Sequence, residues 1–272
     1  MTVRSRDPLS AGSPPEDAHP IEWPQELADV VQHGRLAVVR AEDVDARAGP
    51  WRDHAARAGA VLDALGYESA VAQGLRSRLG VHGGGEVAPV TSMAQLRNSG
   101  HAVFVWLDPL APVAGPEGAP PRYAAIGLLK VGHKKLFLSG PSGPLRECCP
   151  LCVLDFYVRP THQRCGVGLR LFSAMLQALG AEPQTLAYDR PSPKLRAFLG
   201  RHFGLEHPVP QANQFAVFPD LFLHLERLGK RPPAVGLRRS EGEPPAPTYG
   251  TPPSSRQPRS AAFPVTQSRT LW

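Results

Sequence analysis

No stretch of this sequence is apolar for long enough to cross a membrane. A membrane-spanning helix needs about 18 consecutive apolar residues, and no segment approaches that length. The N-terminal segment MTVRSRDPLSAGSPPEDAHP also lacks the apolar core of a secretory signal. Cysteine is scarce, and the four cysteines of the chain all lie between residues 148 and 165. We therefore expect a cytosolic, reduced protein with no membrane association.

The sequence also lacks the motifs of nucleic-acid-binding and zinc-binding domains. There is no aromatic-rich RNA-reading motif and no zinc-finger spacing. The net charge of +6 favours an acidic partner, but charge alone does not select nucleic acid over phosphate or an acidic protein surface. Cys149 and Cys152 form a CxxC pair, which Cys165 and His162 would have to complete from inside a glycine turn. We expect free thiols, no metal and no nucleic acid.

Proline and glycine are abundant, with 31 and 26 residues, and we expect much of this excess outside the core. Near the C-terminus the prolines recur without a period and apolar side chains are sparse, so burial cannot offset the entropy of ordering. We predict a poorly ordered segment (1–34), one folded domain (35–228) and a disordered Pro/Arg-rich tail (229–272). The RPP, PPAP and RQPR pieces of this tail suit a proline-reading adaptor, although a solvated tether is the simpler interpretation.

Between these segments helical and strand periodicities are mixed, which predicts an α/β fold with a central mixed, twisted sheet flanked by helices. Two helical stretches, 53–65 and 69–79, are separated at Gly66 and Tyr67. A strand at 124–131 turns at Gly132–His133 into 134–138, which predicts a hairpin with a basic tip. The other expected elements are strands at 101–107, 152–158, 185–189 and 214–218 and helices at 169–179 and 193–203.

The segment QRCGVG, residues 163–168, joins a predicted strand to a predicted helix. Such a turn leaves backbone N–H groups unpaired at the positive end of a helix dipole, beside Arg164 and Arg170. Gly166 and Gly168 have no side chain, so the backbone can approach a phosphate closely. The turn is therefore predicted to bind an anion.

Three nucleotide-binding motifs compete for this turn. A P-loop is excluded because Leu169 and Arg170 stand where it requires Lys and then Ser or Thr. A dinucleotide fingerprint needs a third small residue where Leu171 stands, although Asp189 falls near its acidic position. The Q/R-x-x-G-x-G/A turn of acetyl-CoA-binding acetyltransferases is met by Gln163, Gly166 and Gly168.

Several longer strings resemble one branch of those acetyltransferases. PLCVLDFYV, QRCGVG, LAYDRPSPKLRAFL, HFGLEHPVPQANQFAVF and KVGHKKLF are similar to segments of the α-tubulin N-acetyltransferases, within the Gcn5-related acetyltransferase superfamily. The resemblance covers about residues 35–222 and runs without gaps from Lys130 to Phe222. Departures include Arg159–Pro160–Thr161 in place of His-Glu-Ser, Cys165 in place of a histidine or similar residue, and His133 in place of a tyrosine.

The resemblance implies the Gcn5-related fold, acetyl-CoA as co-substrate and a set of site residues. Its catalytic residues match Gln73, Cys152 and Asp189. Its basic, tubulin-facing residues match Lys130, Lys134, Lys135, Arg164 and Arg190. Its acetyl-CoA contacts match two segments: Phe156, Tyr157, Val158, Arg159, Pro160, Thr161, His162, Gln163, Arg164, Cys165, Gly166, Val167, Gly168 and Leu169, and Ser192, Pro193, Lys194, Leu195, Arg196, Ala197, Phe198, Leu199, Gly200 and Arg201.

A lysine ammonium, with an ordinary pKa near 10.4, must lose a proton before it attacks a thioester. Asp189 is expected to accept that proton directly or through water, and Cys152 is a candidate to share the relay. The alternatives are that Asp189 caps the following helix and that Cys152 only fills the core. A backbone N–H of 156–158 is the candidate donor to the thioester oxygen. Direct transfer is preferred over an acyl-enzyme on Cys152, and Asp155 is interpreted as structural.

The resemblance thus implies transfer of acetyl to a lysine of α-tubulin, on a loop inside the microtubule lumen. The protein is accordingly expected in the cytoplasm on microtubules, including those of the ciliary axoneme. Two alternatives remain: an acetyltransferase of the same fold with another amine substrate, and a catalytically silent microtubule-binding module.

Overall fold

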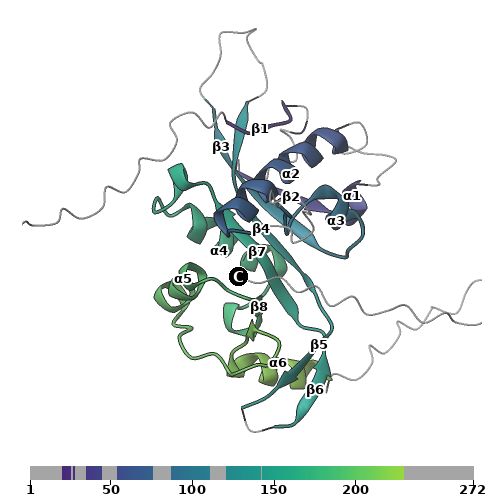
Figure 1. Cartoon of the computed structure of the whole chain (residues 1–272), viewed down its shortest axis with the longest axis vertical. Helices are drawn as coiled ribbons and strands as arrows, with labels where there is room; N and C mark the ends of the chain where they lie inside the picture. The colour runs from purple at the N-terminus through teal and green to yellow at the C-terminus, as the bar shows by residue number, and fades with distance from the viewer. Residues whose placement is uncertain are drawn as a thin grey trace, which may run out of the picture.

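A computed structural model describes residues 20–25, 27, 35–44, 54–75, 87–110, 121–141 and 143–229. Its centre is a seven-stranded sheet in the order β2-β3-β4-β7-β8-β9, with β1 paired to β4 (Figure 1). All strand pairs are antiparallel except β7 with β8, so the predicted mixed sheet is confirmed. The strands are β1 (Glu22–Trp23), β2 (Leu36–Arg40), β3 (Ala102–Pro109), β4 (Tyr123–His133), β7 (Leu151–Val158), β8 (Ala187–Asp189) and β9 (Phe215–Ala216).

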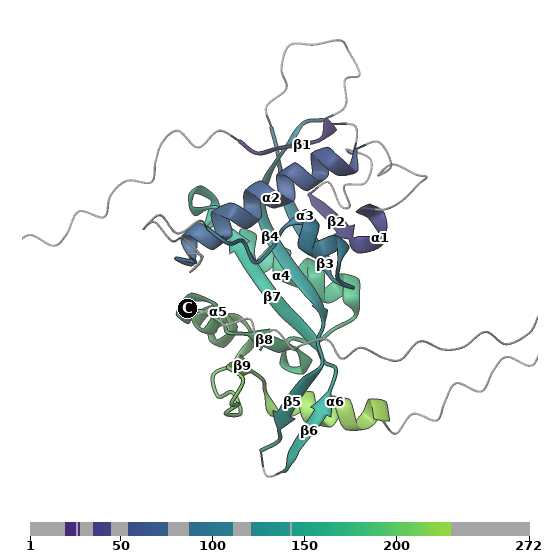
Figure 2. The ribbon, with the colours of Figure 1, turned by 45° about the vertical axis from the view of Figure 1, so that its right-hand side comes forward.

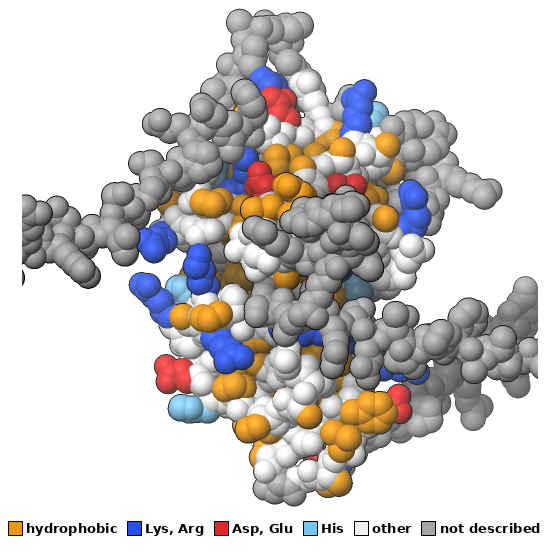
Figure 3. Space-filling model, in the orientation of Figure 1, with side chains coloured by type: hydrophobic (Ala, Val, Ile, Leu, Met, Phe, Trp, Pro, Cys, Tyr) orange, Lys and Arg blue, Asp and Glu red, His pale blue; other side chains and the backbone are white. Residues whose placement is uncertain are grey.

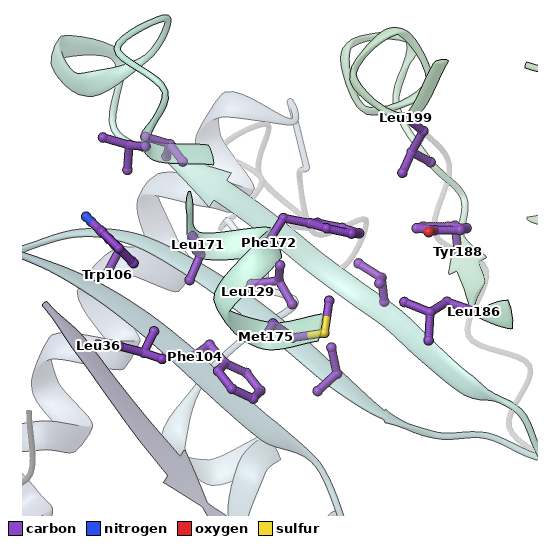
Figure 4. Close-up of a cluster of buried hydrophobic side chains, with 14 of the residues drawn as sticks. Leu36, Phe104, Trp106, Leu129, Leu171, Phe172, Met175, Leu186, Tyr188 and Leu199 are labelled. Carbon is purple, nitrogen blue, oxygen red and sulfur yellow. The ribbon is translucent and has the colours of Figure 1, made fainter. Parts of the chain in front are cut away.

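Helices cover both faces of the sheet. In Figure 2, α2 lies across the near face of the upper strands and α4 lies behind them. The face under α4 holds one apolar cluster, in which Phe172 and Met175 of α4 meet Phe104 and Leu129 of the strands (Figure 4). The helices are α1 (Ala41–Val44), α2 (Ala55–Ala72), α3 (Met93–Arg97), α4 (Val167–Leu179), α5 (Pro193–Phe203) and α6 (Pro219–Gly229).

The local signals around α4 and α5 were sufficient to predict both helices. α4 ends at Gly180, which takes a left-handed φ of 57°, and backbone bonds from Gly180 and Ala181 close its last turn. α5 begins after Ser192, whose hydroxyl accepts a hydrogen bond from the N–H of Leu195 at 3.2 Å. The predicted strands at 101–107, 152–158, 185–189 and 214–218 are also confirmed within a few residues.

The predicted break between two helices at Gly66 and Tyr67 is wrong. α2 runs unbroken through both residues. Gly66 serves a packing purpose instead, because a Cβ there would lie 1.8 Å from the backbone oxygen of Thr91. The glycine lets the segment before α3 press against α2. Residues 76–79 of the second expected helix lie outside the described residues.

The predicted hairpin at Gly132–His133 is also wrong. β4 continues to His133, and from Gly127 to Val131 both of its edges are occupied, one by β3 and the other by β7. The following segment therefore cannot pair back onto β4. It forms β5 (Leu136–Ser139), which pairs with β6 (Leu145–Cys148) in a separate two-stranded sheet.

The N-terminal segment predicted to be poorly ordered contributes to the fold. Glu22 and Trp23 pair with β4, and the side chains of Trp23 and Leu27 are buried in the cluster beneath α2. The folded part therefore begins before residue 35. The rest of 1–34 and residues 230–272 lie outside the described part of the chain, so the tail and its adaptor remain predictions.

A register shift in β7 determines which side chains reach the site. The pairing of β4 with β7 is irregular between Lys130 and Val131. Val153 and Phe156 both pack in the cluster under α4, although a regular strand would place them on opposite faces. Their neighbours Cys152 and Asp155 therefore both face the side of the sheet that carries α2.

Candidate active site

The sheet opens between β7 and β8. These parallel strands pair along Cys152–Val153 and Ala187–Tyr188 and no further. β8 ends at Asp189, while β7 continues to Val158 with β4 on one side only (Figure 2). The free edge of β7 offers backbone groups to an extended ligand. The opening leaves the edge of residues 156–158 unpaired on this side.

The glycine turn follows the free edge of β7 directly. Gly166 has a φ of 77° and precedes α4, whose first N–H groups have no acceptor within the helix. Arg164 also has a positive φ, 63°, which is unusual for a residue with a side chain. The Gln163 side chain donates to the backbone oxygen of Val158 at 2.7 Å and ties the turn to the strand. The geometry therefore fits the predicted anion-binding turn.

Aromatic packing brings the two predicted acetyl-CoA segments together. The rings of Phe156 and Phe198 lie 5.4 Å apart between centroids. Gly168 lies beside them, since a Cβ there would be 3.3 Å from Phe156. Figure 3 shows basic side chains gathered on the left, around the turn and α5. The exposed basic residues of these elements are Arg164, Arg170, Lys194, Arg196 and Arg201.

The Arg159 side chain is directed away from this turn. It is buried against α2, where its Nε and Nη2 each donate to a Glu68 carboxylate oxygen at 3.0 Å. Tyr157 donates to the same carboxylate at 3.3 Å. The expectation that Arg159 binds cofactor therefore does not hold for its guanidinium, which fastens β7 to α2.

Asp189 lies at the end of β8, between two cations. Its Oδ2 is 3.1 Å from Nζ of Lys134, and its Oδ1 is 3.9 Å from Nε of Arg190. Lys134 also lies 5.4 Å above the ring of Phe215. Ser192, and not Asp189, caps α5, so the capping alternative for Asp189 is wrong. The Asp189 side chain remains 21% exposed.

Cys152 is completely buried beside this carboxylate. Its Sγ donates to the backbone oxygen of Pro150 at 3.4 Å. Burial raises the pKa of the Cys152 thiol to about 12, and the nearby charge of Lys134 only partly opposes this shift. The sulfur is therefore a neutral thiol at physiological pH and a poor nucleophile.

Gln73 lies at the C-terminal end of α2, over Asp155. Its Nε2 donates to Oγ of Ser69 at 2.8 Å and to Oδ1 of Asp155 at 3.1 Å. Burial raises the pKa of Asp155, while hydrogen bonds from Thr91, Ser69 and Gln73 oppose that shift. Sequence reasoning missed this cluster, because its members come from segments far apart in the chain.

The Lys130 side chain does not face the protein surface. Its side chain is buried, and its ammonium donates to the backbone oxygen of Val90 at 2.8 Å. Burial lowers the pKa of Lys130, and the charge of Asp155 opposes this shift. The expectation of a tubulin-facing Lys130 is wrong, because position 130 points under α2. Lys135 and Arg164 are exposed as expected.

His101 is a further residue of this region that the sequence did not reveal. Its ring fills the space beside Gly132, where a Cβ would lie 2.0 Å from the imidazole. Gly132 is paired with Cys152 across β4 and β7. Burial, together with the charges of Lys130 and Lys134, lowers the pKa of His101. The signal that could have found it is a lone histidine just before a buried strand.

The described residues contain neither a metal-binding group nor a membrane-spanning helix. Among them, no group of three or more His, Cys, Asp or Glu side chains could hold a metal ion. Within the same described part of the chain, no helix has the length and apolar character needed to cross a bilayer.

Comparison with known proteins identifies the family. Residues 26–238 match the family model described as GNAT acetyltransferase, Mec-17. Alpha-tubulin N-acetyltransferase 1 of Danio rerio is 42% identical over 185 residues, which cover 67% of this chain and 55% of that protein. The alpha-tubulin N-acetyltransferase of Trichoplax adhaerens is 40% identical over 163 residues, covering 60% and 64%. That of Phytophthora infestans is 54% identical over 99 residues, covering 36% and 55%.

The chain thus spans between 55% and 64% of the length of these curated relatives. The matched region contains the whole site described above, from Gln73 to the residues of α5. The chain belongs to the Mec-17 family of GNAT acetyltransferases.

Proposed function

We propose that this protein transfers acetyl from acetyl-CoA to the ε-amine of a lysine in a luminal loop of α-tubulin. The observation that carries the proposal is the opening between β7 and β8. A free strand edge, the glycine turn and the Asp189 carboxylate border this opening, which supports the proposal. The names of the relatives above support α-tubulin as the substrate. We further propose the cytoplasmic microtubule as the place of action.

The residues present fit acetyl-CoA. The N–H groups of 164–168 suit its diphosphate, because they lie at the start of α4. The basic side chains of the turn and of α5 complement the remaining phosphate charge. The edge of 156–158 suits the pantetheine amides and can donate to the thioester oxygen. When bound, acetyl-CoA supplies an activated acyl group.

Asp189 is the proposed proton acceptor. The ε-ammonium of the substrate lysine gives up a proton to the carboxylate, directly or through water. The neutral amine nitrogen then forms a bond to the acetyl carbon as the carbon–sulfur bond breaks, and the departing sulfur takes up a proton. The Lys134 ammonium is paired with the Asp189 carboxylate at 3.1 Å, and the substrate ammonium has to displace it.

The burial of Cys152 supports direct transfer. An acyl-enzyme would require a thiolate, and the pKa of about 12 keeps this thiol protonated. Cys152 can take part only as a neutral group next to the site. Exposed basic residues such as Lys135 and Arg164 are proposed to face the acidic tubulin surface.

The test is acetylation of assembled microtubules by purified protein and acetyl-CoA, read by mass spectrometry of α-tubulin. Asp189→Asn is expected to lower transfer strongly while acetyl-CoA binding persists. Asp108→Asn is the matched control. Asp108 lies on β3, and the change breaks its 2.5 Å ion pair with Arg35. An unchanged rate in Asp189→Asn would refute the role of that carboxylate.

Two other outcomes would replace the proposed function. Faster acetylation of free polyamines or lysine than of tubulin would favour an acetyltransferase with another amine substrate. Microtubule binding by the wild-type protein without any acetyl transfer would favour a silent binding module.

A further inference from the structure

We propose that Asp155 is a positioning residue: it fixes the side-chain amide of Gln73 so that the amide oxygen is presented to the incoming lysine as a hydrogen-bond acceptor. The inference rests on the proposed function, because it names the partner of that oxygen as the substrate amine. It assigns a task to a carboxylate that the sequence suggested was structural.

The two oxygens of Asp155 have separate partners. Oδ1 accepts from Oγ of Ser69 at 2.9 Å and from Nε2 of Gln73 at 3.1 Å. Oδ2 accepts from Oγ1 of Thr91 at 2.6 Å. One oxygen therefore holds the end of α2, and the other holds the segment that precedes α3.

These contacts determine which way the Gln73 amide points. Both hydrogens on Nε2 are used, one toward Ser69 and one toward Asp155. The reversed amide would place its oxygen against the carboxylate, where two acceptors would face each other. The observed orientation turns Oε1 away from Asp155. Oε1 is buried, and no donor reaches it among the described residues.

A buried acceptor without a donor is unfavourable, and a bound ligand that supplies an N–H removes that penalty. The proposed substrate carries such a donor, because its amine has N–H bonds before and after it loses a proton. Gln73 and Cys152 lie on the same side of the sheet, since Cys152 and Asp155 share that face. The charges of Asp155 and Lys134 both act on the Lys130 ammonium, and Lys134 pairs with Asp189 at 3.1 Å, so the unpaired oxygen and the proposed proton acceptor belong to one region.

The surrounding fold opposes the effect of burial, which raises the pKa of Asp155. Gly66 allows the backbone at Thr91 to press against α2, which delivers the Thr91 hydroxyl. The same segment holds the Lys130 ammonium through the backbone oxygen of Val90 at 2.8 Å. This buried cation favours the charged form of the carboxylate. Asp155 can therefore remain an acceptor for both hydrogens aimed at it.

Asp155→Asn tests the proposal, with Thr91→Val as a matched control. The asparagine amide can offer its N–H₂ to Gln73, so the Gln73 amide is free to turn and lose its acceptor. We expect kcat/KM for an α-tubulin peptide to fall about tenfold, as for one lost charge-assisted hydrogen bond, with the acetyl-CoA Kd unchanged. Thr91→Val removes a bond to the same carboxylate and is expected to lower Tm but leave kcat/KM unchanged.

Rescue provides a second test that a merely structural role would not pass. Gln73→Glu places a carboxylate against Asp155 and is expected to abolish transfer. In the double variant with Asp155→Asn, the asparagine N–H₂ can donate to the new carboxylate, so activity is expected to return in part. If the double variant is no better than Gln73→Glu alone, the proposal is overturned.

A readout independent of catalysis separates this inference from the proposed function. In the NMR spectrum of the wild-type protein, the Gln73 side-chain N–H₂ should exchange slowly with solvent, and Asp155→Asn should speed that exchange where Thr91→Val does not. This result would stand even if the wild-type protein transferred nothing to tubulin. Equal loss of kcat/KM in Asp155→Asn and Thr91→Val, or fast Gln73 exchange in the wild-type protein, would overturn the inference.

Discussion

Replacing Gly66 with alanine is expected to destabilise this protein, although glycine-to-alanine changes inside helices normally stabilise them. Alanine is favoured over glycine in a helix interior by about 1 kcal/mol. At Gly66, however, the new Cβ would lie 1.8 Å from the backbone oxygen of Thr91. That atom cannot yield as a flexible side chain would, so the segment carrying Thr91 has to move away from α2.

The movement would break two buried hydrogen bonds to charged groups, that of Thr91 to Asp155 and that of Lys130 to Val90. Each such bond contributes about 1.5–3 kcal/mol. After the gain in helix propensity, the expected net loss in the free energy of unfolding is about 2–5 kcal/mol.

Urea unfolding followed by circular dichroism measures this change. Gly200→Ala is the matched control, because Gly200 also lies inside a helix, α5. A Cβ at Gly200 would lie 3.3 Å from the side chain of Glu206, which is flexible and can move. We expect that control to be neutral or to gain up to about 1 kcal/mol. A Gly66→Ala protein as stable as the wild type would refute the argument that Gly66 exists for this close contact.

Two further predictions concern titrating groups. At neutral pH iodoacetamide should modify the exposed thiols Cys149 and Cys165 but not Cys152, whose pKa is raised to about 12; modification of Cys152 in a peptide map would contradict its assigned state. The pKa of His101 is lowered by burial, so below about pH 6.5 the unfolded chain binds a proton there more readily than the folded protein, and stability should fall as the pH drops. His101→Gln should flatten that part of the stability curve, and an unchanged slope would show that His101 does not contribute.

The acetyl-CoA end of the site could be read from the sequence because its signals are local. The strand, the turn from Gln163 to Gly168 and the start of α4 follow one another in the chain, and each is specified by adjacent residues. The same holds for Ser192 and α5, where cap, proline and apolar stripe occur in order. The structure confirms these elements and adds the aromatic contact between Phe156 and Phe198 that joins them.

The α2 side of the site could not be read in this way. Lys130 stands in a string that suggested a basic hairpin, but it lies on a central strand, and its buried ammonium donates to the backbone oxygen of Val90. Asp155 occupies the α2 side through a register shift that strand alternation does not predict. Ser69 and Thr91 meet its carboxylate from helix and loop only because Gly66 permits a close backbone contact.

The difference between the two ends has a physical cause. A backbone turn can hold a phosphate by its own conformation, so its sequence signature is compact. An acceptor for a substrate amine needs a side chain whose orientation is fixed by other side chains, and here those lie 64 to 86 residues from Asp155 for Thr91, Gln73 and Ser69. Contacts of that separation leave no periodic trace in the chain. It follows that variants of Ser69 or Asp155 should weaken the reaction of the substrate lysine more than the binding of acetyl-CoA.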